Sequence, residues 1–174
     1  MVSIQLESYE LEVAHVVGHR RHSANEAKRD APYYDRSRME DNLTASIAAA
    51  ACEMGVAKAL GRYWAPSAWD SSVHHKHLAH PDVAPNIEVR RVREPGNPLV
   101  VRSLDVSRGR IMVSAYAHRD TNFSLIDVTG WLPATEAWRA GSPAYYDADG
   151  ARLVNQSDLN NIIELIAGLP VVTA

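Results

Sequence analysis

The feature that most constrains the fold is a short alternation of apolar and charged residues, Ile87-Glu88-Val89-Arg90. Side chains alternate across a β-strand, so a strand here directs Ile87 and Val89 into a core and places Glu88 and Arg90 together on the other face. The alternation predicts a strand over residues 86–93. A carboxylate beside a guanidinium on that face is either a plain ion pair or part of a charged site, and the pattern leaves both interpretations open.

Two helical segments precede this strand. Apolar residues at helical spacing after Ser8 predict a helix over residues 8–24, with room to continue to about residue 29. Pro32 disfavours helix at the residue before it and so ends this segment. A second helix is expected from residues 39–42 to Leu60. Its apolar stripe consists of Leu43, Ile47, Ala50, Met54 and Ala57.

Further strands are expected at 98–103, 110–117 and 122–129. Turn residues at 94–98 and 107–109 would join the first three strands as a meander. A helical turn at 135–139 and a helix at 158–167, capped by Ser157, complete the chain. The order of two helices, several strands and a short helix predicts an α/β or α+β domain.

Composition narrows the class of protein. The 174 residues suit one compact domain. The net charge of −3 means that the chain as a whole is not a polycation for binding nucleic acid. Residues 82–119 nevertheless carry seven basic and four acidic side chains, a local surplus of three positive charges. The single cysteine, Cys52, excludes an internal disulfide and a cysteine-rich zinc module. No leader or membrane-spanning run is recognisable, which predicts a cytoplasmic location without membrane attachment.

Three carboxylates and one cation are the candidate functional residues. Glu53 lies among alanines at the margin of the second helix's apolar stripe, and Asp82 precedes the strand that carries Glu88. Converging carboxylates can bind a hard divalent cation. Such an ion polarises a phosphoryl oxygen and lowers the pKa of a bound water. Arg90 can stabilise transition-state charge but, remaining protonated, cannot be a general base. The alternative for Glu53 is a salt bridge with Lys58 or an arginine.

A histidine-rich loop lies between the second helix and Asp82. Its His74–His80 spacings can ligate zinc or nickel. Without cysteines or a fixed helical frame, contact with a substrate is the better interpretation of these histidines.

Glu53 on a helix, Asp82 before a strand, and Glu88-Val89-Arg90 on it together resemble the pattern of the PD-(D/E)XK nuclease superfamily. The wider run over residues 40–135 resembles small uncharacterised phage-encoded nuclease-like proteins. The resemblance implies a central mixed β-sheet flanked by helices, with a restriction-endonuclease-like core. It divides one nuclease-like domain, 1–174, into a helical part (1–38), a core (39–135) and an extension (136–174).

The resemblance further implies a nuclease, encoded by a phage or prophage, that hydrolyses nucleic acid, with DNA rather than RNA as the expected substrate. Asp82, Glu88 and Glu53 would be ligands of Mg²⁺ or Mn²⁺, and with Arg90 they would form the catalytic set. Arg90 stands where the superfamily has lysine. The alternative is therefore a catalytically inactive nuclease-like domain that binds nucleic acid or a protein as an accessory or inhibitory factor. A homo-oligomer is left open.

Overall fold

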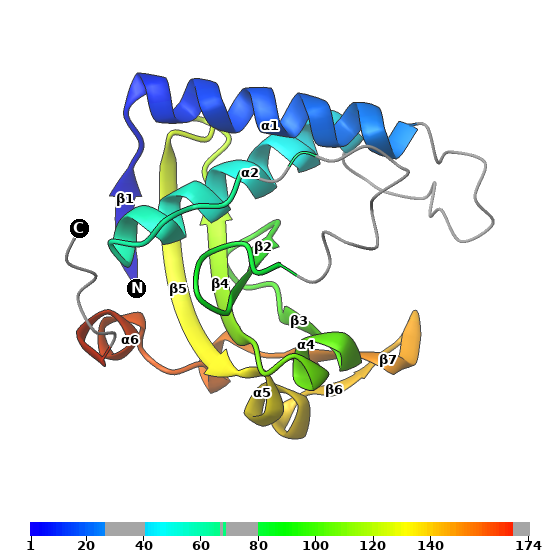
Figure 1. Cartoon of the computed structure of the whole chain (residues 1–174). Helices are drawn as coiled ribbons and strands as arrows, with labels where there is room; N and C mark the ends of the chain where they lie inside the picture. The colour runs from blue at the N-terminus through cyan, green and yellow to red at the C-terminus, as the bar shows by residue number, and fades with distance from the viewer. Residues whose placement is uncertain (27–40, 67, 69–79, 169–174) are drawn as a thin grey trace.

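The computed structural model describes residues 1–26, 41–66, 68 and 80–168 (Figure 1). Its centre is a four-stranded mixed sheet in the order β1-β5-β4-β2. The edge strand β2 runs parallel to β4, whereas the other neighbours are antiparallel. The strands are β1 (Val2–Gln5), β5 (Leu125–Pro133), β4 (Ile111–Ala117) and β2 (Ile87–Val92).

Helices α1 (Ser8–Glu26) and α2 (Asn42–Ala59) pack against each other, and α2 contacts all four strands (Figure 1). Both helices form close to their predicted bounds. The side chain of Asp41 caps α2 by accepting from the backbone N–H of Thr44 at 2.9 Å. Small residues permit close packing. A Cβ added to Gly55 would lie 2.8 Å from Ile126 on β5, and one on Gly18 would lie 2.6 Å from the Cα of Ile47.

A second, three-stranded antiparallel sheet has the order β3-β7-β6. With two short helices it encloses a second apolar cluster that includes Leu99, Val101, Met112 and Val154. The strands are β3 (Leu99–Arg102), β7 (Asp147–Val154) and β6 (Ser142–Ala144). The helices are α4 (Ser103–Ser107) and α5 (Ala134–Ala140), followed by the 3₁₀ turn η2 (Gln156–Asp158) and α6 (Ile162–Gly168).

The α+β class is confirmed, but the predicted meander is wrong. Strand β4 lies parallel to β2, and a parallel pair needs a crossover connection rather than a hairpin. That crossover is β3 followed by α4, and β3 pairs with β7 in the other sheet. Residues 107–109 therefore end α4 instead of forming a hairpin turn, and Gly109 there has a left-handed φ of 60°.

Other elements differ in extent or were not predicted. Strand β5 continues through Gly130 and Trp131 to Pro133, and the last helix begins at Ile162. Strand β1 and the β6–β7 hairpin have no counterpart in the sequence-based prediction. No helix of the described residues is long and apolar enough to cross a membrane. The predicted histidine loop lies, apart from His80, outside the described residues.

Candidate functional site

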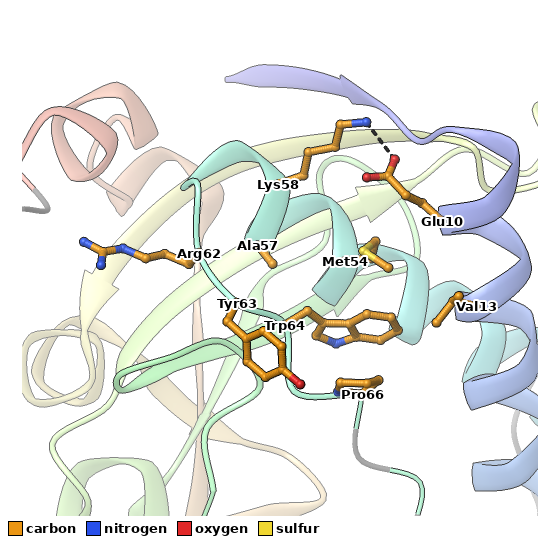
Figure 2. A pocket seen from close by; sticks show the side chains of 9 residues that line it. All are labelled: Glu10, Val13, Met54, Ala57, Lys58, Arg62, Tyr63, Trp64 and Pro66. Carbon is orange, nitrogen blue, oxygen red and sulfur yellow. Dashed lines mark hydrogen bonds and ion pairs between the residues drawn. The ribbon is translucent and has the colours of Figure 1, made fainter. Parts of the chain in front are cut away.

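A surface cavity of about 380 Å³ lies between α1, α2 and the segment that follows α2 (Figure 2). Its mouth carries an ion pair between Glu10 and Lys58, at 2.7 Å. The ring of Trp64 lines the cavity, together with Tyr63. The predicted site residues do not belong to its described lining, which is Glu10, Val13, Met54, Ala57, Lys58, Arg62, Tyr63, Trp64 and Pro66.

Trp64 connects this cavity to the first predicted site residue. Its indole Nε1–H donates to Oε2 of Glu53 at 3.0 Å. Glu53, only 6% exposed, also accepts two bonds from the guanidinium of Arg21, at 2.6 and 2.8 Å. The salt bridge expected as the alternative for Glu53 is thus present, with an arginine of α1, while Lys58 pairs with Glu10 instead. Both carboxylate oxygens of Glu53 are engaged by protein groups.

Arg21 is a residue that the sequence analysis did not select. It continues the buried stripe of α1 that includes Ala14 and Val17, and its own exposure is 9%. Burial opposes its charge, but the nearby carboxylates, Glu53 first among them, together outweigh burial and raise the pKa of Arg21. A charged residue on an apolar stripe requires a buried partner. The place of Arg21 on that stripe was therefore the signal in the sequence that could have identified it.

Strand β2 has the predicted alternation. Ile87 and Val89 are buried, while the side chains of Glu88 and Arg90 lie on the other face with 18% and 21% exposure. Nη1 of Arg90 lies 2.7 Å from Oε1 of Glu88, so the two form an ion pair. On the far side of Glu88, Nε of Arg110 lies 3.8 Å from Oε2.

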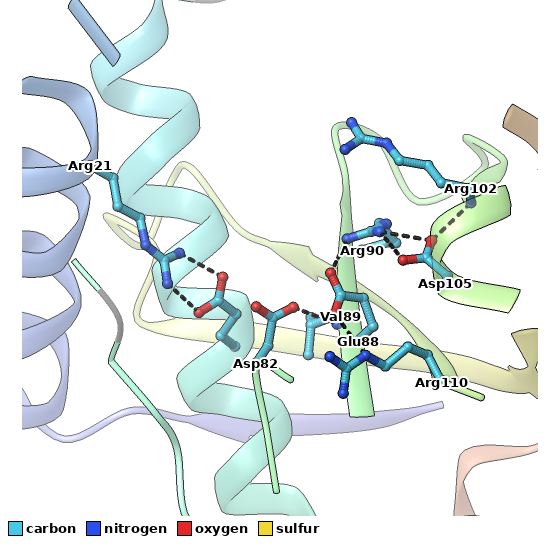
Figure 3. A network of polar contacts seen from close by, with 9 residues as sticks. Arg21, Asp82, Glu88, Val89, Arg90, Arg102, Asp105 and Arg110 are labelled. Atoms are coloured by element: carbon cyan, nitrogen blue, oxygen red, sulfur yellow. Dashed lines mark hydrogen bonds and ion pairs between the residues drawn. The ribbon is translucent and has the colours of Figure 1, made fainter. Parts of the chain in front are cut away.

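Arg90 is also held by Asp105 of α4. Its Nη2 donates to both oxygens of Asp105, at 2.9 and 2.8 Å, and Asp105 accepts from the backbone N–H of Arg102 (Figure 3). Asp105 lies within α4 and is 5% exposed. Burial opposes the charge of Arg90, yet Glu88 and Asp105 outweigh it and raise its pKa. Arg90 therefore remains a cation.

Asp82 lies between two ion pairs, Arg21–Glu53 on one side and Glu88–Arg90 on the other (Figure 3). Glu53, Asp82 and Glu88 are called the acidic row below. It immediately precedes Val83, which bridges to Trp64 and to Ile87. Oδ2 of Asp82 accepts from the backbone N–H of Val89 at 2.9 Å, and so satisfies a donor on the sheet's edge strand.

The electrostatics of the row single out Asp82. Burial, followed by the negative charges of Glu53 and Glu88, raises the pKa of Asp82 well above its usual value. Glu53 and Glu88 are each bonded by a guanidinium, whereas Asp82 is bonded by a backbone amide. Burial and the charges of these two neighbours therefore disfavour the ionised form of Asp82.

All three predicted ligands are carboxylates, the hard oxygen donors that a divalent cation takes. Asp82 accepts from a backbone amide, whereas both oxygens of Glu88 face cations, Arg90 at 2.7 Å and Arg110 at 3.8 Å, which a metal ion at Glu88 would have to displace. Glu53 does not fit direct coordination in this arrangement because Arg21 and Trp64 occupy its oxygens. Within the described ranges, no group of three or more histidine, cysteine, aspartate or glutamate side chains is arranged to hold a metal ion.

No protein-family model, curated protein or solved structure matches the chain. The assignment of a function therefore depends on the residues and contacts of this chain.

Proposed function

We propose that the chain is a divalent-metal-dependent nuclease of the PD-(D/E)XK superfamily, with a restriction-endonuclease-like core around β2. The observation that supports this proposal is the place of Asp82, a partly buried carboxylate whose pKa is raised by burial and by both neighbours, Glu53 and Glu88. Holding like charges close together is unfavourable unless a cation joins them. A helix acid, an acid before a strand and an acid on that strand are the parts from which the superfamily builds its site.

In this proposal Asp82 and Glu88 hold Mg²⁺ or Mn²⁺, and Glu53 acts through a bound water. The ion would supply a polarised phosphoryl oxygen and a water of lowered pKa. Arg90, fixed between Glu88 and Asp105, would stabilise charge that develops on the scissile phosphate. Arg21 would hold the Glu53 carboxylate in place through two hydrogen bonds.

The proposed substrate is nucleic acid, DNA more readily than RNA, cut to leave 5′-phosphate and 3′-hydroxyl ends. The positive surplus of residues 82–119 supports attraction of a phosphate backbone to the strand that carries Glu88. A phage or prophage origin and action in the host cytoplasm belong to the same proposal.

A second candidate function has its own supporting observation. Arg90 donates three hydrogen bonds to Glu88 and Asp105, which restricts its freedom to bind a reacting phosphate. A catalytically inactive domain that binds nucleic acid, or a protein partner, through the same face would keep such a structural pair.

Cleavage assays separate the two candidates. Linear, nicked and single-stranded DNA and RNA are incubated with the protein and Mg²⁺ or Mn²⁺. The nuclease should cut at least one substrate only with metal. Glu88→Gln should lower the rate at least about 100-fold, the scale expected when a charge-stabilising group is lost. Glu94→Gln, an exposed acid beyond the same strand, is the matched control and should keep wild-type activity.

Absence of cleavage under every condition, with nucleic-acid binding intact in both wild type and Glu88→Gln, would contradict the nuclease and favour the binding domain. Equal cleavage by wild type and Glu88→Gln would contradict the assignment of the site.

A further inference from the structure

The turn of the β6–β7 hairpin presents two adjacent aromatic side chains to solvent. Tyr145 is 93% exposed and Tyr146 is 56% exposed. Their rings meet edge to face, with centroids 5.1 Å apart and an interplanar angle of 89°. Figure 1 shows the hairpin extending past α4. At these exposures the two rings add little to the core, so most of their apolar surface is available to a ligand.

A cation accompanies the two tyrosines. Arg102 ends β3, opposite Ala151 of β7, and is exposed. Its backbone N–H donates to Asp105, and Figure 3 marks no interaction between its guanidinium and the acids drawn there. Within the described part of the chain, no ion pair engages that guanidinium. Arg102 differs in this respect from Arg90 and Arg21, whose guanidinium groups are each held by a carboxylate.

Strand pairing brings the hairpin next to Arg102, because β3 pairs with β7, the strand that Tyr146 directly precedes. Burial raises the pKa of Tyr146, while the positive charges of Arg102 and Arg90 act in the opposite direction. The tyrosine hydroxyl is therefore within electrostatic range of both arginines. The two rings and Arg102 thus belong to the second sheet, and Asp105 joins the end of its strand β3 to Arg90.

We propose that Tyr145, Tyr146 and Arg102 form a binding surface for an unpaired segment of a nucleic-acid strand. Bases of the segment stack on the tyrosine rings and a phosphate binds Arg102. The next phosphates then extend toward Arg90. This inference rests on the proposed function, for which it defines the substrate as nucleic acid with single-stranded or splayed bases beside the cleavage point.

The chemistry favours an unpaired strand over a duplex. Aromatic side chains contribute to binding by stacking on bases, whose faces are accessible only where a strand is single or splayed. Duplex binding through the phosphate backbone needs cations and gains little from two adjacent tyrosines.

Fluorescence anisotropy of a labelled single-stranded oligonucleotide and of its duplex, both with EDTA, tests the surface. The double variant Tyr145→Ala/Tyr146→Ala should weaken single-strand binding at least about fivefold, the lower end for loss of one stacked base. Duplex binding and the melting temperature should stay unchanged. Arg102→Ala should weaken single-strand binding and lower the slope of log affinity against log salt by about 0.7. The matched control is Tyr9→Ala/Arg20→Ala on α1, an exposed tyrosine and arginine far from the hairpin.

Three results would overturn the surface: wild type without measurable single-strand binding, a hairpin variant that binds like wild type, or an equal loss in the α1 control. An equal loss of duplex and single-strand binding would overturn the preference for unpaired bases. Because metal is absent from this assay, its result is independent of cleavage. If binding depends on the hairpin here, but the separate assays with Mg²⁺ or Mn²⁺ show no cleavage, the nuclease is contradicted and the binding surface is retained.

Discussion

Replacing Arg21 by methionine removes the cation that balances Glu53. The carboxylate would keep its bond from Trp64 but lose both guanidinium bonds, at 2.6 and 2.8 Å, in a place where it is 6% exposed and beside Asp82. Breaking a buried ion pair from one side costs about 3–5 kcal/mol, because the remaining charge stays desolvated and uncompensated. For a chain of this size, that loss corresponds to a fall in melting temperature of roughly 6–20 °C.

Urea unfolding at pH 7, followed by far-UV circular dichroism, measures the change. Arg20→Met, the exposed neighbour on α1, is the matched control and should remain within about 0.5 kcal/mol of wild type. The double variant Arg21→Met/Glu53→Gln should recover most of the loss, since no buried charge remains without its partner. If Arg21→Met unfolds within about 1 kcal/mol of wild type, Arg21 does not provide the charge balance described for Glu53.

Two further predictions concern charge and packing. Burial and neighbouring carboxylates raise the folded-state pKa of Asp82. The contribution of Asp82 to the free energy of unfolding therefore falls as pH rises from about 4 through that raised pKa. Asp82→Asn should therefore be more stable than wild type at pH 7 without divalent ions. In urea titrations the difference in free energy of unfolding between the two proteins should shrink toward pH 4, and a difference that does not change with pH would refute this. Gly55→Ala should cost about 1–3 kcal/mol, since its Cβ would lie 2.8 Å from Ile126, whereas Gly96→Ala, with open space around it, should be near neutral by the same unfolding assay.

Local patterns were sufficient for the elements that carry the acids. The alternation of Ile87–Arg90 and the apolar stripe of the second helix each depend on neighbours in sequence, and both elements form as predicted. Strand pairing depends on distant partners. Nothing local to Leu99–Arg102 indicates that it pairs with β7 instead of β2, so the order of the sheets could not be derived from the pattern.

The candidate site shows the same division. Glu53, Asp82 and Glu88 were selected by residue type and spacing, and electrostatics place Asp82 near both other acids. Their counter-charges come from elsewhere in the chain. Arg21 lies 32 residues from Glu53, and Asp105 lies 15 residues from Arg90. Spacing along a strand cannot predict which distant side chain neutralises an acid. The sequence therefore offered both a metal ligand and a salt bridge for Glu53, without identifying Arg21 as the partner.

Titration with Mn²⁺, followed by electron paramagnetic resonance of the free ion, most directly tests the proposed metal site. Performed with and without a bound oligonucleotide, it should show one Mn²⁺ per wild-type chain that Mg²⁺ displaces. Asp82→Asn and Glu88→Gln should each lose this ion, because two carboxylates are its proposed protein ligands. Glu94→Gln should retain it. Wild type without bound Mn²⁺ in either condition, or binding unchanged in Asp82→Asn and Glu88→Gln, would contradict the proposal.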